Sequence, residues 1–245
     1  MSTFAISSLL GLAAALADVF GGLVLVRTTW EKRYLRYFVA LGAGFMLSTA
    51  FLEMIPESFR LSTRWTPGLV FGGYCAIHLM EHTITPHFHF GEETHSHEFL
   101  SRRITNSVVG GLAVHSLFDG VAIASGFLLS HWLGWVVFLA IFLHKIPEGF
   151  TVASVTLAGG RSRGAALLSA AIVATATLGG VLVINCLPAW VRAGLPLSAG
   201  VAIYVAATDL VPEVNREPGV RMAMVFFAGV AIFLVCKILA QGLLS

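Results

Sequence analysis

Two short motifs each place a histidine and a carboxylate four residues apart. His115 precedes Asp119 by four positions, and His144 precedes Glu148 by the same interval. Residues four apart lie on one face of an α-helix, so each pair would project together. Imidazole and carboxylate groups bind zinc and other borderline divalent metals. The four side chains therefore predict a metal site that lacks thiolates, which suits an ion that must also be released.

Both motifs lie inside long apolar segments, at residues 104–129 and 132–158. At 1.5 Å rise per residue, His115 and His144 would each lie roughly 17 Å into their segments, near the middle of a ~30 Å hydrocarbon core. Ionisable groups are costly in lipid, so they are functional candidates there. One such histidine alone more often serves packing, but two matched pairs at equal depth favour a metal site.

The composition of the chain indicates an integral membrane protein. Of its 245 residues, 57% are hydrophobic and 11% are charged, whereas a soluble domain has roughly 25% charged residues. The net charge of +2 argues neither for nor against nucleic acid. We expect the lipid bilayer and divalent metal ions as partners, and no nucleic acid. The apolar segments are long enough for spanning helices, and the prediction is an all-α protein with eight spans, at residues 4–26, 37–59, 67–86, 104–129, 132–158, 164–186, 195–214 and 222–243.

The basic residues predict the orientation of these spans, because lysine and arginine collect in cytoplasmic loops. The positive charges follow the first apolar segment rather than precede it, which predicts an uncleaved span. With both termini outside, the inner loops hold ten basic residues and the outer loops hold three. The inner set is Arg27, Lys32, Arg33, Arg36, Arg102, Arg103, Arg161, Arg163, Arg216 and Arg221, and the outer set is Arg60, Arg64 and Arg192.

Two further motifs place carboxylates on either side of a proline. Residues 53–57 read Glu-Met-Ile-Pro-Glu and residues 209–213 read Asp-Leu-Val-Pro-Glu. They lie on predicted spans that run in opposite directions, which is the pattern of an inverted repeat. Their carboxylates could form outer and inner metal sites along a path, or be solvated at the membrane interface. The residues concerned are Glu53 and Glu57 on the outer side, and Asp209 and Glu213 on the inner side.

Each of these motifs also frees a backbone carbonyl. Proline lacks an N–H, so Pro56 cannot bond the carbonyl of Leu52, and Pro212 cannot bond that of Thr208. A free carbonyl beside a carboxylate could help to remove water from a passing cation, although a simple kink is an equal alternative. Asp18, in the first apolar segment, is interpreted as a helix-packing residue.

A histidine-rich tract lies between the third and fourth predicted spans, at residues 87–98. We expect its histidines to bind metal weakly on the inner side, because ordering a loop costs entropy. His78, Glu81 and His82, near the inner end of the third span, could extend the exit path or lie at the interface. The histidines of the tract are His87, His89, His95 and His97.

At these residues the chain resembles the ZIP (Zrt/Irt-like) family of metal transporters. The resemblance rests on His115-Ser-Leu-Phe-Asp119-Gly120 and His144-Lys-Ile-Pro-Glu148-Gly149, together with the eight-span layout and the histidine-rich loop. It implies a 3+2+3 helical bundle, often dimeric, that moves metal toward the cytoplasm. It also implies that the metal ligands are His115, Asp119, His144 and Glu148.

Two residues depart from the pattern of the family and put a two-metal centre in doubt. Ser116 stands where the family commonly has asparagine, and we keep it among the candidate ligands. Lys145 stands where some members have a further metal ligand. A lone buried ammonium is costly unless it is paired. The hypothesis is that Lys145 takes the place of a second cation, balances the carboxylates and leaves a single transported ion.

Zinc is the expected ion, with iron, manganese and cadmium as alternatives, in a plasma membrane or a bacterial inner membrane. Three other functions stay open at this point. An intramembrane zinc hydrolase would need an open coordination position and a general base, and Glu148 could be that base, although HExxH is absent. A haem protein could use His115 and His144 as axial ligands. The third is a metal sensor that transports nothing.

Overall fold

The computed structural model describes residues 2–27, 32–83, 102–215 and 220–244, and all regular structure among them is helical. The prediction of an all-α protein is confirmed for these residues. Helices cover the described residues of all eight predicted apolar segments. They are α1 (Thr3–Arg27), α2 (Lys32–Thr49), η1 (Ala50–Met54), α3 (Ile55–Leu61), α4 (Thr66–Thr83), α5 (Arg102–Leu129), α6 (His131–Ala158), α7 (Arg163–Cys186), η3 (Pro188–Trp190), α8 (Val191–Tyr204), η4 (Val205–Leu210), α9 (Val211–Asn215) and α10 (Val220–Leu244).

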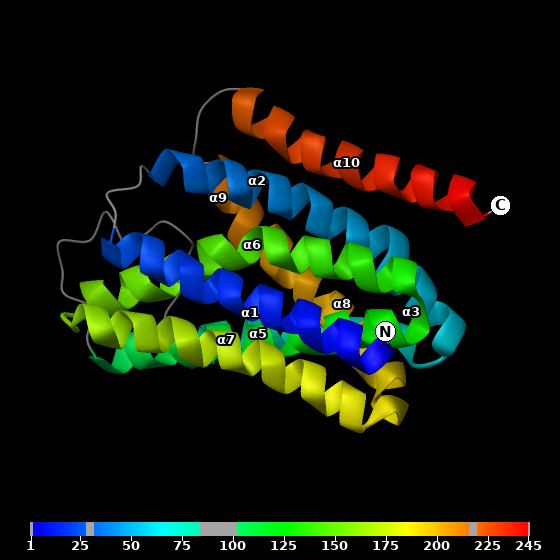
Figure 1. Cartoon of the computed structure of the whole chain (residues 1–245), viewed down its shortest axis with the longest axis horizontal. Coiled ribbons are helices and arrows are strands. Elements are labelled where there is room, and N and C mark those ends of the chain that lie inside the picture. Colours follow the sequence, from blue (N-terminus) through cyan, green and yellow to red (C-terminus); the bar gives the residue numbers. More distant parts are fainter. Residues whose placement is uncertain (1, 28–31, 84–101, 216–219, 245) are drawn as a thin grey trace.

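Among the described residues, seven helical stretches are long and apolar enough to cross a membrane. The remaining predicted span, α4, is less apolar because His78, Glu81 and His82 lie in its last turns. The start of α1 and the end of α10 lie at the same end of the bundle (Figure 1). An odd number of crossings would separate them, so this arrangement favours α4 as a further crossing. We call this end the terminus end, and the opposite one the loop end.

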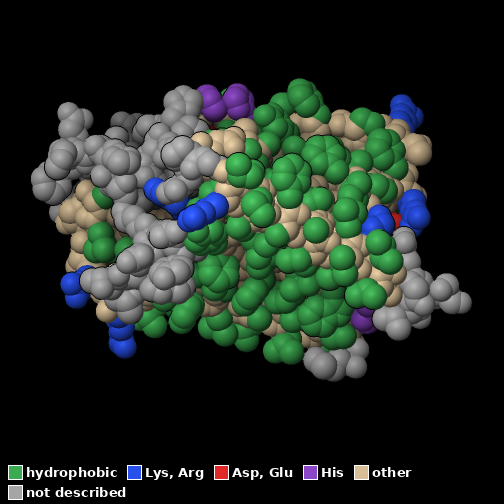
Figure 2. Space-filling model, turned by 90° about the horizontal axis from the view of Figure 1, so that it is seen from above, with side chains coloured by type: hydrophobic (Ala, Val, Ile, Leu, Met, Phe, Trp, Pro, Cys, Tyr) green, Lys and Arg blue, Asp and Glu red, His purple; other side chains and the backbone are tan. Residues whose placement is uncertain are grey.

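The outer surface of the bundle is apolar, as a lipid-facing surface must be. Figure 2 shows hydrophobic side chains over the middle of one face, with lysine and arginine side chains toward its two ends. Large apolar side chains are exposed on several helices, among them Leu16, Phe71, Leu168 and Phe227. In water such a surface would drive aggregation, so the surface agrees with a membrane setting.

Glycines allow the helices that carry the candidate site to approach closely. A Cβ on Gly149 of α6 would collide with the backbone oxygen of Asp18 in α1, and one on Gly21 would collide with the backbone oxygen of Ile146. The contact between α5 and α7 has the same form, with Gly120 and Gly180 as the crossing glycines. Backbones that touch in this way bring side chains of α1 next to α6.

Two helices contain a turn of π-helix just before a proline. In the first, η1 joins α2 to α3 and precedes Pro56; in the second, η4 joins α8 to α9 and precedes Pro212. The N–H of Ile55 donates to the carbonyl of Ala50, five residues back, instead of the usual four. Such turns often lie at functional sites. Here they hold the predicted path residues Glu53 and Asp209.

Candidate metal centre

The register of α5 and α6 places their motifs at the same level. The two helices are joined at Ser130, whose hydroxyl accepts a hydrogen bond from the N–H of Leu133 and caps α6. His115 lies fifteen residues before Ser130, and His144 lies fourteen residues after it. Antiparallel neighbours with so short a connection must bring these two histidines to nearly equal depth.

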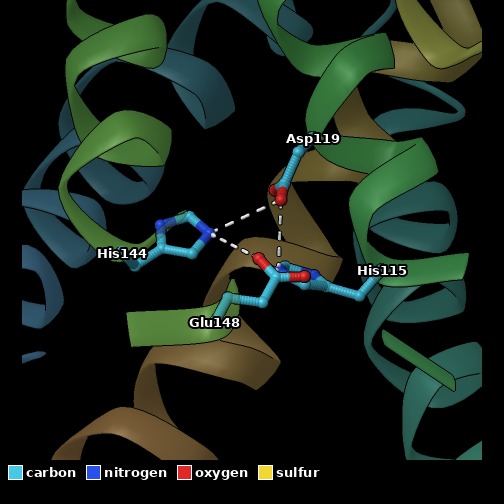
Figure 3. A group of neighbouring side chains, drawn as sticks. All are labelled: His115, Asp119, His144 and Glu148. Atoms are coloured by element: carbon cyan, nitrogen blue, oxygen red, sulfur yellow. Dashed lines mark ion pairs between the residues drawn. The ribbon is translucent and has the colours of Figure 1, made fainter. Parts of the chain in front are cut away.

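The four predicted ligands converge in the interior of the bundle (Figure 3). The Oδ2 atom of Asp119 lies 3.2 Å from Nε2 of His115 and 3.4 Å from Nε2 of His144. Glu148 Oε2 lies 4.0 Å from each of these nitrogens. One ligand atom from each residue fits within 4.8 Å of all the others, and all four residues are buried. This geometry could hold a metal ion.

His144 is held with its Nε2 atom toward the other ligands. Its Nδ1 lies 2.9 Å from the carbonyl oxygen of Ala140. A carbonyl can only accept, so Nδ1 carries the proton, and in a neutral ring Nε2 keeps its lone pair. A second-sphere bond of this kind is usual for metal-binding histidine. Among the residues that the structure describes, neither His115 Nε2 nor His144 Nε2 makes a hydrogen bond.

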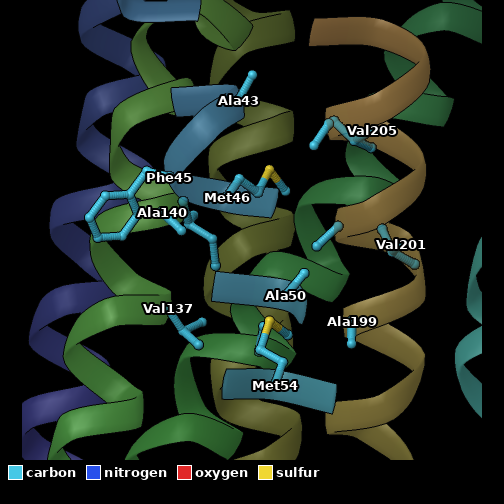
Figure 4. Close-up of a cluster of buried hydrophobic side chains, with 14 of the residues drawn as sticks. Ala43, Phe45, Met46, Ala50, Met54, Val137, Ala140, Ala199, Val201 and Val205 are labelled. Atoms are coloured by element: carbon cyan, nitrogen blue, oxygen red, sulfur yellow. The ribbon is translucent and has the colours of Figure 1, made fainter. Parts of the chain in front are cut away.

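An apolar core beside α6 fixes the position of this backbone. Ala140, whose carbonyl orients His144, packs with Val137 in a cluster that includes Ala43 and Met46 of α2 and Val205 of η4 (Figure 4). Close packing of this kind resists displacement of the backbone. The core therefore helps to preorganise the histidine.

Lys145 lies at the centre of the charges rather than at the membrane surface. Its Nζ is 2.7 Å from Glu148 Oε2 and 2.9 Å from Asp119 Oδ2. It also donates a hydrogen bond of 2.7 Å to the hydroxyl of Ser116. That hydroxyl in turn donates to Glu148 Oε1 over 2.5 Å. Both Lys145 and Glu148 are fully buried, so the ammonium is paired as the hypothesis for Lys145 requires.

Asp18 of α1 joins this network, and the sequence interpretation missed it. Its carboxylate is fully buried, and Oδ2 lies 3.5 Å from Nζ of Lys145. The available signal was an acid in the middle of an apolar segment, which is a functional candidate by default. Asp18 is therefore part of the charged network and not only a helix-packing residue. The centre thus contains three carboxylates, on α1, α5 and α6, around one ammonium.

Comparison with known proteins identifies the family of the chain. The model of the family described as "ZIP Zinc transporter" matches residues 1–109 and 91–237, which together cover most of the sequence. The chain belongs to the ZIP zinc transporter family. Because this is a family of transporters and not of enzymes, the alternative of an intramembrane hydrolase is set aside.

Individual relatives within the ZIP family are distant. Zinc transporter ZIP9-A of Xenopus laevis is 24% identical over 88% of this chain and 87% of its own length. Zinc transporter YKE4 of Saccharomyces cerevisiae is 24% identical over 72% of this chain and 60% of its own length. Zinc transporter ZIP5 of Mus musculus is 31% identical over 52% of this chain and 25% of its own length. The match thus spans less than two thirds of the yeast and mouse proteins.

Glu53, Glu57 and Asp209 of this ZIP chain lie outside the four-residue cluster. Glu53 pairs with Lys237 over 2.8 Å, and Glu57 pairs with Arg60 over 2.8 Å. Asp209 is buried, and the hydroxyl of Thr208 lies 3.3 Å from its Oδ1. The side chain of Glu213 and the whole tract 87–98, with its four histidines, lie outside the described residues.

The haem alternative does not fit the positions of the histidines. Axial ligands must face each other across a porphyrin plane. Here Asp119 Oδ2 lies within 3.4 Å of both Nε2 atoms, and Glu148 Oε2 lies 4.0 Å from each, so this small space already holds carboxylate oxygens. A macrocycle could enter only if these carboxylates and their helices moved away, so the arrangement favours a bare ion.

Proposed function

We propose that the chain carries divalent transition metal ions, with zinc as the first candidate, across the membrane toward the cytoplasm. The proposed binding site is a single-metal centre formed by His115 and Asp119 of α5 and by His144 and Glu148 of α6. The observation that carries this proposal is the convergence of four buried ligand atoms within 4.8 Å, inside a ZIP family chain. The relatives named above are called zinc transporters, which supports the choice of metal.

The spacing of the ligand atoms is compatible with zinc. Zinc–ligand bonds of about 2.0–2.2 Å place neighbouring ligands of a tetrahedron about 3.4 Å apart. The separations between imidazole nitrogens and carboxylate oxygens run from 3.2 to 4.0 Å. A small closure around an ion would complete the geometry. The same ligand types accept iron, manganese and cadmium, so these metals belong in any test.

We further infer an inverted repeat of the 3+2+3 type from paired helix contacts. The first helix of each half packs on a central helix, α1 on α6 and α7 on α5. The second helix of each half packs on the third helix of the other half, α2 on α10 and α8 on α4. The π-helical turns η1 and η4 occupy matching places in the two halves. Transporters built in this way bind their substrate where the repeats meet and open to each side in turn. In this chain that place is between α5 and α6.

Uptake by the purified protein tests the proposal directly. Proteoliposomes that contain only this chain should take up zinc down its gradient, because four ligands without thiolate can both bind and release the ion. Iron, manganese and cadmium are tested in the same assay, with protein-free liposomes as the control. Zinc uptake no faster than in protein-free liposomes would contradict a transport function and would favour the sensor alternative.

The orientation has its own test. Ser62, between α3 and α4, and Arg192, at the start of α8, belong to connections at the terminus end. Because basic residues favour the cytoplasmic side, we expect cysteine at either position to react with an impermeant thiol reagent applied to intact cells. Cysteine in place of Arg163, at the loop end, is the matched control and should react only after the membrane is opened. Labelling in the reverse order would show that the termini face the cytoplasm.

Three further parts of the proposal come from the sequence and from the resemblance to the family. We propose a location in the plasma membrane or a bacterial inner membrane, a homodimer, and weak accessory metal binding by residues 87–98. That tract lies outside the described residues, so its role stays a prediction.

A further inference from the structure

A lysine near the end of α10 reaches across to the π-helical turn of the second span. Lys237 Nζ lies 2.8 Å from Glu53 Oε1 and donates a hydrogen bond of 3.1 Å to the carbonyl oxygen of Leu52. The two charged side chains are 28% and 16% exposed. The ammonium thus holds one carboxylate oxygen and one carbonyl oxygen, which are the ligand types that hard divalent cations prefer.

The local backbone explains why this carbonyl oxygen is accessible to a cation. Four residues after Leu52 stands Pro56, which has no N–H to donate. The oxygen therefore lacks its ordinary helical donor and accepts a hydrogen bond from Lys237. Glu57 and Trp132 line the same cavity, of about 260 Å³, at the terminus end. Arg60 lines the cavity as well, and its guanidinium pairs with Glu57 over 2.8 Å from a largely exposed position. The cavity thus combines two carboxylates and a carbonyl with two basic side chains, of which Lys237 is the more buried.

The opposite half of the bundle carries a different charge at the matching position. Gly229 of α10 touches the backbone of α2 at the crossing of these two helices. Gly73 of α4 touches the backbone of α8 in the same way. Eight residues after Gly229 stands Lys237, whereas eight residues after Gly73 stands Glu81. Glu81 accepts a hydrogen bond of 2.7 Å from the hydroxyl of Tyr204. The helix crossing itself therefore does not require a lysine, and the positive charge is particular to the terminus end.

We propose that the ammonium of Lys237 is a tethered cation that occupies a divalent-cation site formed by Glu53 and the Leu52 carbonyl. Glu57 lies beside this site and can join it when it leaves the exposed Arg60. An ion that approaches the centre from the terminus end must displace the ammonium before it can use these oxygens. Lys237 thereby sets the affinity of this outer site and keeps hard, abundant cations from settling in it. The inference rests on the proposed transport function for its biological meaning, but the site can be measured without transport.

Terbium luminescence can report the site, because Tb³⁺ prefers oxygen ligands and is excited through a nearby tryptophan. Trp132 lines the cavity and serves as the donor. Detergent-solubilised protein is titrated with Tb³⁺, and Lys237→Met is expected to show sensitised emission at a concentration at least about tenfold lower than the unmutated chain. Lys237→Arg, which keeps the positive charge, should behave like the unmutated chain. Adding Glu53→Gln or Trp132→Phe to Lys237→Met should remove the gain.

Arg221→Met is the matched control, since it removes a positive charge from the other end of the same helix. The inference is overturned if Lys237→Met binds Tb³⁺ no more tightly than the unmutated chain, or if Arg221→Met produces an equal gain. The proteoliposome assay separates this result from the proposed function. If Lys237→Met binds Tb³⁺ more tightly but the unmutated chain takes up no zinc, the transport proposal is refuted and the outer cation site still stands. If the unmutated chain takes up zinc but Lys237→Met binds Tb³⁺ no more tightly, only the outer cation site is refuted.

Discussion

Alanine in place of His115 or Glu148 is expected to reduce zinc flux into proteoliposomes by about tenfold or more. Both side chains are buried and contribute ligand atoms to the four-residue cluster. Inside the bundle, water cannot freely replace a missing ligand. Loss of an outer-sphere partner alone typically costs roughly 10–100-fold in metal affinity, so loss of a direct ligand should cost at least as much.

The choice of control decides how this experiment is interpreted. His131 lies on the same helix as His144 but is exposed at the first turn of α6. His131→Ala removes an imidazole without touching the centre, and its flux should match that of the unmutated chain. Comparison at equal protein level in the membrane separates lost transport from lost folding. Unchanged flux in both His115→Ala and Glu148→Ala would refute the central-site hypothesis.

The central cluster could be predicted from the sequence because its geometry is mostly local. Helical periodicity places residues four apart on one face of the helix. The short connection at Ser130 sets the relative depth of the two histidines. The pairing of α5 with α6 then follows from their adjacency in the chain. For these reasons the predicted His115, Asp119, His144 and Glu148 do converge.

Contacts between distant helices could not be predicted in the same way. Asp18 reaches Lys145 only because α1 crosses α6 at Gly21 and Gly149. No local pattern specifies which glycine meets which helix. The pairing of Glu53 with Lys237 joins residues far apart in the sequence, and it engages a carboxylate that the sequence alone presents as a metal ligand. Tertiary packing decided both results.

Replacement of Lys145 by aspartate is expected to let the proposed one-ion centre accept a second ion or prefer a different metal. The reason is the charge balance of the centre. With Asp18, Asp119 and Glu148 counted as ionised, the carboxylates carry three negative charges and Lys145 supplies one positive charge. The remainder of two negative charges matches one divalent cation. Lys145→Asp raises this remainder to four, which two divalent cations would match.

The positions of the atoms support this exchange of one cation for another. Lys145 Nζ lies within 3.5 Å of carboxylate oxygens from all three acids, so a metal in its place would meet the same oxygens. Removing the ammonium without replacing it leaves buried negative charges unpaired, which is costly. Lys145→Met is therefore the matched control. It has a similar length and no charge, and it adds no ligand oxygen.

Metal counting on purified protein measures the outcome, with residues 87–98 deleted so that the histidine-rich tract does not contribute. The unmutated centre should hold about one tightly bound zinc ion per chain, and Lys145→Met should hold no more than one. Lys145→Asp should hold a second ion or change the order of affinities among zinc, cadmium and manganese. If the unmutated centre already holds two ions, the ammonium does not stand in for a cation. If Lys145→Asp keeps one ion and the same order of metals, charge balance does not set the stoichiometry.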